Sequence, residues 1–465
     1  MILLVWGGWS GWRTGAVTVD HLVFVKTTKD QTVTAGDSVT LARWQEQFDE
    51  VFGRVAGRFA RVELRKRARA FVCGLLADLP RKNCWTIAEH AGDPSPDGMQ
   101  HLLTRAVWDH DQVRDDLRGY VTEHLGDAEA VLVMDETGDL KKGVHTVGVQ
   151  RQYTGTAGKV DNAQVAVYLV YASRAGHACI DRELYLPRSW ARDRERCQAA
   201  GVPDQVRFQT KPALARAMLT RALDAGVPAS WAAGDEVYGG DPQLRAELEA
   251  RGVGYVLAVA CDHRVPSGAG THYRADALAA RVPARAWQRL SAGRGAKGHR
   301  WYDWAFIQLD RGGGGGHAWL LLRRNLKTGE LAFYRCFTPR PVPLAVLVRV
   351  AGRRWTVEET FQSGKGLTGL DEHQVRRWTS WYRWATLAML AHAFLAVTAA
   401  SERTQHPPPA GLIGLTCNEI QHLFAALVLQ PVRDAWHRFR WSLWRRRHQA
   451  RARTCHYQRQ ATQPP

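Results

Sequence analysis

From residue 128 to 261 the sequence alternates uninterrupted apolar runs with amphipathic segments, and this alternation restricts the fold more than any other feature. The runs "AVLVMD", "AQVAVYLVYAS" and "GYVLAVA" are apolar on both faces of a strand. The segments "ALARAMLTRALDAG" and "DPQLRAELEARG" have helical spacing. Strands buried on both faces that alternate with helices are typical of a sheet covered by helices. The sequence therefore predicts a mixed α/β sheet in this region.

The chain before this region is predicted to be helical. From Leu41 to about Leu125 apolar residues recur at intervals of three and four, with Arg and Lys between them. The pair "RKNCWTIAEHAG" and "DPSPDGMQHLLTRAVW" predicts a helix, a turn and a helix, which either contact DNA or only pack as a bundle. The first 36 or so residues lack helical periodicity, and "MILLVWGGWSGW" lacks the basic start and cleavage site of a signal sequence.

The chain after residue 261 loses and then regains its helical pattern. Residues 262–345 read as antiparallel strands, and the apolar segments of 346–400 read as helices, followed by a Pro-rich break, one more helix from "TCNE" and a basic tail. We find no segment with the length of uninterrupted apolar sequence that a membrane span needs. The predicted domains are an unstructured extension (1–40), a helical DNA-binding domain (41–127), a catalytic core (128–261 and 346–400), a β-rich insertion (262–345) and a helical, basic C-terminal tail (401–465).

The charge of the chain points to a polyanionic partner. Lys and Arg number 63 against 45 Asp and Glu, a net charge of +18 with a pI near 9.9. Such a surplus usually accompanies nucleic-acid binding, although a genome rich in arginine codons would also raise it. The eight cysteines are scattered without a C-x-x-C pair, so we expect reduced thiols in a cytoplasmic protein.

Three acidic residues occupy positions where carboxylates need a cation. Asp135 ends the first predicted strand, Asp235 ends a later strand in "AAGDEVYGG", and Glu358 lies in a predicted helix in "RRWTVEETF". Three converging carboxylates would repel one another unless a divalent cation lay between them. Oxygen ligands of this kind suit Mg²⁺ or Mn²⁺, and two such ions can promote phosphodiester displacement.

Helical geometry separates the roles of the residues around Glu358. At about 100° per residue, Arg354, Glu358 and Lys365 fall within roughly 40° of one another. Val357 and Phe361 form an adjacent apolar stripe that should face the sheet, so Glu359 is predicted to point into solvent. Periodicity alone also allows a surface ion-pair cluster.

Several long motifs occur together in a fixed order. They are "DETGDLKKGVHTVGVQRQYTGTAGKVDNAQVAVYL", "LYLPRSW", "GDEVYG" and "RRWTVEETFQSGKGLTGLDEHQVRRWTSW". Over residues 45–400 the chain resembles a DDE transposase of bacterial insertion sequences, most closely the insertion-sequence 701 family, a relative of the insertion-sequence 4 group. The resemblance implies an RNase-H-like catalytic core with a β-strand insertion, and it places Asp135, Asp235 and Glu358 as the catalytic, metal-binding triad.

The related group carries a Tyr-x2-Arg-x3-Glu-x6-Lys signature. Arg354, Glu358 and Lys365 fit its spacing, with Arg354 and Lys365 in supporting roles, whereas Ala351 occupies the tyrosine position. That departure concerns the contact of the tyrosine with DNA rather than metal binding.

The function expected from these features is that of a transposase. It would bind the terminal inverted repeats of its element, cleave their ends with two Mg²⁺ (or Mn²⁺) ions and join them to target DNA, acting as a homodimer on double-stranded DNA and away from membranes. After a turn at Gly138, basic and polar residues are expected to contact the DNA backbone: Lys141, Lys142, Arg151, Gln152 and Lys159. The alternatives are a catalytically inactive, transposase-derived DNA-binding protein and a metal-independent hydrolase with paired carboxylates.

Overall fold

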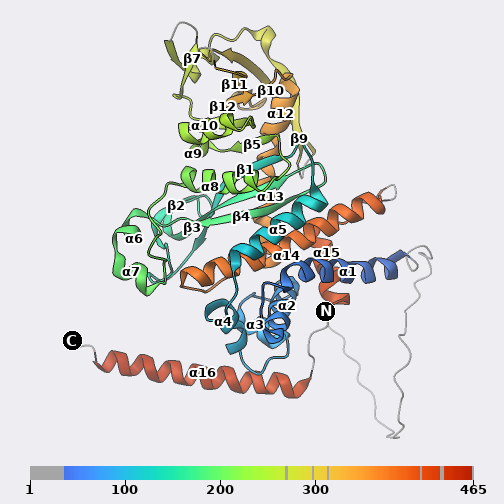
Figure 1. Ribbon diagram of the computed structural model, residues 1–465, viewed down its shortest axis with the longest axis vertical. Helices are drawn as coiled ribbons and strands as arrows, with labels where there is room; N and C mark the ends of the chain where they lie inside the picture. Colours follow the sequence, from blue (N-terminus) through green and yellow to red (C-terminus); the bar gives the residue numbers. More distant parts are fainter. Residues whose placement is uncertain are drawn as a thin grey trace, which may run out of the picture.

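The computed structural model describes residues 36–267, 271–295, 298–311, 314–408, 411–429 and 434–462. Most of the predicted N-terminal extension, residues 1–35, lies outside this range. A ten-stranded mixed sheet runs through the molecule, with helices packed against it (Figure 1). Its strands are β1 (Val131–Leu140), β2 (Gln150–Thr154), β3 (Lys159–Ala172), β4 (His177–Leu184), β5 (Trp231–Gly234), β6 (Gly254–Val259), β9 (Gln288–Gly295), β10 (Gly298–Leu309), β11 (His317–Arg324) and β12 (Leu331–Thr338).

The strand order places the predicted core strands at the centre of the sheet. The order is β2-β3-β1-β5-β6-β12-β11-β10-β9, with β4 paired to β3. The pairs β1–β5 and β5–β6 are parallel and the others are antiparallel. Strands β9 to β12 therefore continue the same sheet beyond β6, while β7 (Arg264–Ser267) and β8 (Thr271–Arg274) form a separate hairpin. The mixed α/β sheet predicted from the apolar runs is confirmed.

Helices occupy the N-terminal part of the chain before the first strand. They are α1 (Gly36–Ala56), α2 (Val62–Leu76), α3 (Cys84–His90), α4 (Asp97–Thr104) and α5 (His110–Leu125). The helical pattern predicted from Leu41 to about Leu125 is first interrupted at residues 57–61, between α1 and α2. Capping by Asn83 starts α3, because its side chain accepts the N–H groups of Trp85 and Thr86.

The helices that follow β4 divide between the sheet and the rest of the molecule. They are α6 (Arg188–Arg192), α7 (Arg194–Ala199), α8 (Lys211–Asp224), α9 (Glu236–Gly239), α10 (Pro242–Ala250), α11 (Ala275–Ala279), α12 (Leu344–Arg353), α13 (Trp355–Thr368), α14 (Trp378–Gln405), α15 (Cys417–Leu427) and α16 (Ala435–Thr462), with a short 3-10 helix at Ala284–Ala286. Helices α8, α9, α10, α12 and α13 contact the central strands, whereas α15 packs against other helices and α16 lies away from the sheet (Figure 1). Thr416 caps α15 as the "TCNE" pattern predicts, because its hydroxyl accepts the N–H of Glu419.

Helix α14 joins the N-terminal helices to the sheet. It packs against α1, α2, α4, α5, α13, α15 and β4. Among the described residues it is the one helix long and apolar enough to cross a membrane, and 94% of its most apolar window is buried inside the protein. Such burial is typical of the core helix of a soluble protein.

Strand β1 corrects the prediction of a turn at Gly138. The strand stays paired with β3 as far as Leu140, which lies opposite Ala163, so the chain does not turn at Gly138. A Cβ at this position would collide with the side chain of Thr154 on β2. Glycine is therefore needed for close approach of the β2–β3 hairpin rather than for a turn.

Candidate active site

Asp135 and Asp235 lie side by side at the centre of the sheet. Parallel pairing of β1 with β5 aligns Met134 with Gly234. Asp135 directly follows Met134, and Asp235 directly follows Gly234. The four residues before Asp135 are buried, as are all four residues of β5. Burial of the strands fixes both backbones, so the two carboxylates come from a rigid part of the molecule.

Asp135 lies within β1 rather than at its end as predicted, because β3 stays paired with the strand as far as Leu140, whereas Asp235 follows β5 directly. In both cases a following backbone N–H group donates to the carboxylate. Asp135 Oδ1 accepts the N–H of Glu136 at 2.8 Å. Asp235 is the N-cap of α9, and its Oδ1 accepts the N–H of Val237 at 2.9 Å. Each donor holds one carboxylate oxygen and leaves the other free for a further partner.

Helix α13 brings Glu358 to the same site through Arg354. The guanidinium of Arg354 donates to Asp135 Oδ2 at 3.0 Å and to Glu358 Oε1 at 3.1 Å. The rotation of the helix is set by Val357, which is buried, and by Phe361, whose ring lies 5.5 Å from that of Tyr168 on β3. The predicted apolar stripe is therefore confirmed.

Glu359 does not point into open solvent as predicted. Its side chain is half-buried and lies 3.6 Å from His177 Nε2 at the start of β4. The hydrogen bond and charge of that imidazole lower the pKa of Glu359, against the effect of partial burial. The prediction failed because His177 at the start of β4 lies against this face of the helix, a contact that periodicity cannot show.

The carboxylates at the site are short of positive charge. Burial raises the pKa of Asp135 to about 7; Arg354 opposes this rise, and the charges of Asp235 and Glu136 add to it. Burial, with the charge of Glu136, also raises the pKa of Asp235. Partly buried carboxylates, two of which share the Arg354 guanidinium, have the oxygen donors and the charge deficit that suit a divalent cation.

Lys365 lies beside β1 rather than on the carboxylates. Its Nζ is 3.4 Å from both Gly138 O and Thr156 Oγ1 and 3.8 Å from Asp139 Oδ1. Asp139 in turn lies 3.0 Å from Nε2 of the buried His373. The ammonium is thus held at the edge of the site nearest the β2–β3 hairpin.

The predicted DNA-contact residues differ in accessibility. Lys142, Arg151 and Lys159 are exposed on or beside the β2–β3 hairpin, and Lys159 pairs with Asp161 at 3.3 Å. Lys141 is half-buried, donates to the carbonyl of His373 at 3.1 Å and has its pKa lowered by burial. Gln152 uses its amide to bind the carbonyl of Ala163 at 2.7 Å.

Sequence reasoning missed a network around Glu136. Its carboxylate accepts the Nζ of Lys211 at 2.5 Å and the hydroxyl of Tyr238 at 2.6 Å. Tyr238 lies within "GDEVYG" and Glu136 within the acidic pair, so both were visible in the motifs. Lys211, at the first turn of α8, carries no local signal and is found only through the fold.

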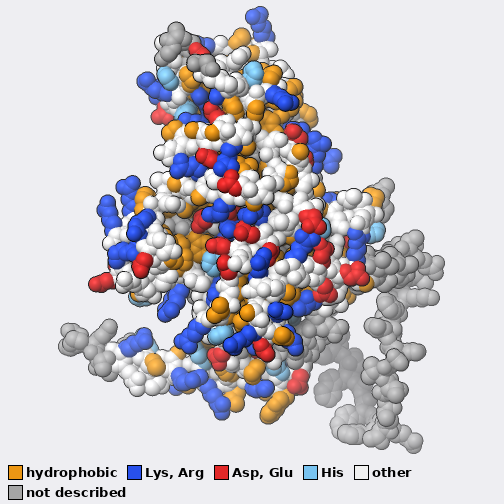
Figure 2. All heavy atoms as spheres, viewed as in Figure 1, with side chains coloured by type: hydrophobic (Ala, Val, Ile, Leu, Met, Phe, Trp, Pro, Cys, Tyr) orange, Lys and Arg blue, Asp and Glu red, His pale blue; other side chains and the backbone are white. Residues whose placement is uncertain are grey.

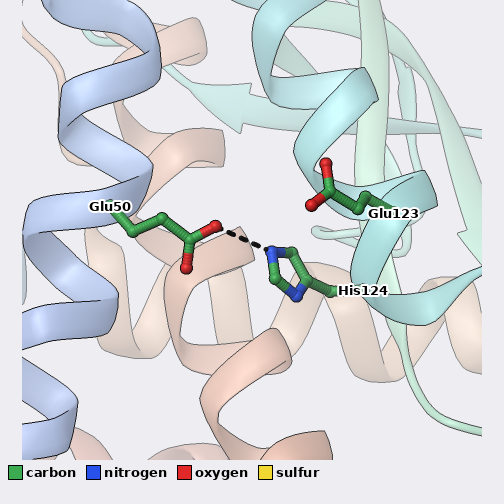
Figure 3. Close-up of side chains that lie close together, drawn as sticks. All are labelled: Glu50, Glu123 and His124. Atoms are coloured by element: carbon green, nitrogen blue, oxygen red, sulfur yellow. Dashed lines mark hydrogen bonds and ion pairs between the residues drawn. The ribbon is translucent and has the colours of Figure 1, made fainter.

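Two other groups of metal-ligand side chains lie away from this site. Among the described residues, ligand atoms within 4.8 Å of one another occur in Glu50–Glu123–His124 and in Asp109–His110–Asp111, and the predicted triad is not such a group. Figure 3 shows the first group, in which Glu50 contacts His124 across α1 and α5. Arg54 pairs with both glutamates, at 2.9 and 2.6 Å. This exposed cluster is therefore neutralised by protein side chains.

Comparison with known proteins identifies the class to which the site belongs. A family model described as DDE superfamily endonuclease matches residues 54–301, more than half of the sequence. The chain belongs to this endonuclease family. The matched range includes Asp135 and Asp235 and ends before Glu358.

A curated relative gives a more particular assignment. "Probable transposase for insertion sequence element IS701" from Microchaete diplosiphon is 32% identical over 194 residues, which are 41% of this chain and 48% of the relative. The resemblance to insertion-sequence 701 transposases is confirmed, over about half the length of that relative.

A solved structure is also similar over much of the chain. It is the "Cryo-EM structure of piggyBac transposase synaptic complex with hairpin DNA", which matches 86% of this chain and 84% of that chain with a TM-score of 0.41 and 12% identity. Values this low do not establish a shared fold.

Proposed function

We propose that the protein is a transposase that binds the terminal inverted repeats of an insertion sequence, cleaves DNA at its ends and joins them to target DNA. The observation that carries this proposal is the pairing of β1 with β5, which aligns Asp135 and Asp235, together with the bridge from Asp135 through Arg354 to Glu358. The central strands would correspond to an RNase-H-like core.

Asp135, Asp235 and Glu358 would hold two Mg²⁺ or Mn²⁺ ions. Bound ions would supply an activated hydroxyl and stabilise the leaving oxygen at phosphorus. Arg354 now bridges two of the three carboxylates. It would turn toward the phosphate when the ions neutralise them, because a guanidinium binds phosphate oxygens in the same two-pronged way.

The remaining basic residues would hold the DNA backbone. Lys365 at the edge of the site would steady the phosphate, and the exposed side chains of Lys142, Arg151 and Lys159 would contact the duplex near the β2–β3 hairpin. Lys141 and Gln152 would act chiefly by ordering this hairpin, since both are hydrogen-bonded to backbone carbonyls. A second copy of the chain would bind the other element end.

Strand cleavage of a duplex that carries the repeats flanking the gene tests this function. We expect cleavage with Mg²⁺, none with EDTA, and loss of cleavage but not of binding in Asp135→Asn. Asp262→Asn is the matched control, because Asp262 is exposed and lies outside the site. Binding without cleavage by the native chain would favour the inactive DNA-binding alternative. Cleavage that survives chelation would contradict the proposed chemistry.

A further inference from the structure

A positively charged cavity lies beside α12 and α13, and its lining contains none of Asp135, Asp235 and Glu358. Its volume is about 590 Å³, within the range of cavities that hold small ligands. It is lined by the ends of β4, β9 and β10, by α12 and α13 and by the end of α14. Six arginines line it: Arg174, Arg294, Arg300, Arg349, Arg353 and Arg403. Figure 2 shows Lys and Arg side chains gathered along the edge of the molecule beside α12 and β9.

Carboxylates compensate this charge only in part. Glu359 is the one acidic residue among those lining the cavity, and it is paired with His177. Arg349 pairs with Glu129 at 3.0 Å, and Arg174 lies 3.9 Å from Asp127. The other arginines have no carboxylate within ion-pair distance in the described part of the chain.

Of the four arginines without an acidic partner, two donate to backbone carbonyls, and the guanidinium groups of the other two have no hydrogen bond to the described residues. Arg300 donates to the carbonyls of Ala292 and Gly352 at 2.9 and 3.0 Å, yet its Nε is buried without an acceptor. Arg403 donates to the carbonyl of Ala175 at 2.6 Å. Neither Arg294 nor Arg353 has a hydrogen-bond acceptor for its guanidinium among the described residues.

Arg353 carries the clearest electrostatic cost. Burial lowers its pKa, and the positive charges of Arg349 and Arg174 lower it further, against the effect of Asp127. Arg174, Arg294 and Arg403 are exposed, whereas Arg300, Arg349 and Arg353 are half-buried. A half-buried guanidinium without an acceptor does not stabilise a fold. Such an arrangement is expected where an anion supplies the missing acceptors.

We propose that this cavity binds the phosphates of a DNA backbone, at a position other than the phosphodiester held beside the carboxylates. The proposal rests on the proposed function and gives the protein a second surface that contacts DNA. Arg353 and Arg354 are consecutive residues at the junction of α12 and α13; Arg353 lines the cavity and Arg354 binds Asp135 and Glu358. DNA bound in the cavity would therefore also hold the helix that carries Glu358.

Removing two of the unpaired charges tests the proposal. Binding of a labelled repeat duplex to the full chain is measured by fluorescence anisotropy in EDTA over a range of salt concentrations. We expect Arg294→Gln with Arg353→Gln to weaken binding about tenfold or more and to reduce the slope of log affinity against log salt by about one to two. The control Arg264→Gln with Arg285→Gln removes the same charge from two exposed residues remote from the cavity.

Thermal unfolding gives a second readout that misfolding cannot imitate. The double variant should unfold at a higher temperature than the native chain without DNA, because like charges have been removed, and sulfate should stabilise the native chain more than the variant. A variant that is more stable and binds DNA more weakly supports the proposal. Unchanged DNA affinity and salt slope would overturn it, even if sulfate still binds.

The outcome is separable from that of the proposed function. If Asp135→Asn abolishes cleavage while the cavity variant binds DNA like the native chain, only the second surface is wrong. If the native chain shows neither binding nor cleavage of repeat DNA, the proposed function fails and the cavity proposal fails with it.

Discussion

Two clusters of acidic and basic side chains lie on the same sheet. Several arginines surround one carboxylate in the first, and carboxylates outnumber the basic side chains in the second. Around Asp181 on β4, a carboxylate with 1% exposure, Arg114 and Arg221 bind at 2.9 and 3.0 Å, and Arg182 lies 3.7 Å away. Around Asp135, Arg354 is shared by Asp135 and Glu358, Lys211 pairs with Glu136, and Asp235 has no ion-pair partner in the described part of the chain.

Carboxyl pKa values are shifted in opposite directions near the two clusters. Despite burial, His110 and the nearby Arg182 and Arg114 lower the pKa of Asp111, which borders the Asp181 cluster. The pKa of Asp135 and that of Asp235 are raised. The first cluster ties α5, β4 and α8 together, so its charges serve stability. The second has four carboxylates for two basic side chains, Arg354 and Lys211, which stabilises the fold less and leaves negative charge for bound ions.

The largest effect should come from neutralising an acid of the Asp135 cluster and measuring activity. Glu358→Gln should lower single-turnover cleavage of repeat DNA with Mg²⁺ by roughly 10³-fold or more, because loss of an ion's charge stabilisation is worth several kcal/mol. Glu195→Gln, an exposed residue of α7, makes the same chemical change away from the site. Equal rates for the two variants would remove Glu358 from the catalytic set.

The reverse pattern is expected for the Asp181 cluster. Asp181→Asn should destabilise the protein by about 3–5 kcal/mol, because it leaves Arg114, Arg182 and Arg221 buried or half-buried with one fewer counter-charge. Urea unfolding measures the change, with Asp262→Asn as the exposed control. An unchanged midpoint would show that the other acids of the cluster suffice, and the contrast between the clusters would weaken.

Sequence reasoning could find the carboxylate site because its signals are local. Asp135 and Asp235 each follow a run of buried apolar residues, and the parallel pairing of β1 with β5 places the two runs in register. Glu358 could be assigned to a helix face because Val357 and Phe361 mark the buried stripe. Those patterns needed no knowledge of distant contacts.

Apart from the break at residues 57–61, the errors and omissions concern contacts between different segments of the chain. A turn was expected at Gly138, yet β3 holds β1 in register for two further residues. The solvent-facing assignment of Glu359 failed because His177 comes from another strand. The basic cavity joins residues from 173 to 403, and no window of sequence contains more than a few of them. The Asp181 cluster was missed for the same reason.

Glu136 lies in the Asp135 cluster, and its role in stability or in catalysis can be tested. It belongs to the acid-rich site by position but is paired with Lys211 and Tyr238. Tyr238→Phe should cost about 2 kcal/mol in urea unfolding, because a buried hydrogen bond to a charged group is lost, and should slow cleavage far less than Glu358→Gln. Tyr153→Phe, at a position that is 64% exposed, is the control. A cleavage loss equal to that of Glu358→Gln would place Glu136 among the catalytic residues.

The smallest effect concerns the stability of the metal-free protein. In EDTA, Asp135→Asn should stabilise the fold by about 1 kcal/mol at pH 8, because the variant does not bury an ionised carboxylate beside Asp235 and Glu136. Since the folded pKa is about 7 and the unfolded value 3.8, the native carboxyl gains its proton in the folded state first as pH falls. The advantage of the variant should therefore shrink between pH 8 and pH 4. Thermal unfolding across this pH range measures the difference in stability between the variant and the native chain. A difference that grows toward low pH would contradict the prediction and would mean that the Asp135 carboxylate is stabilised by its partners.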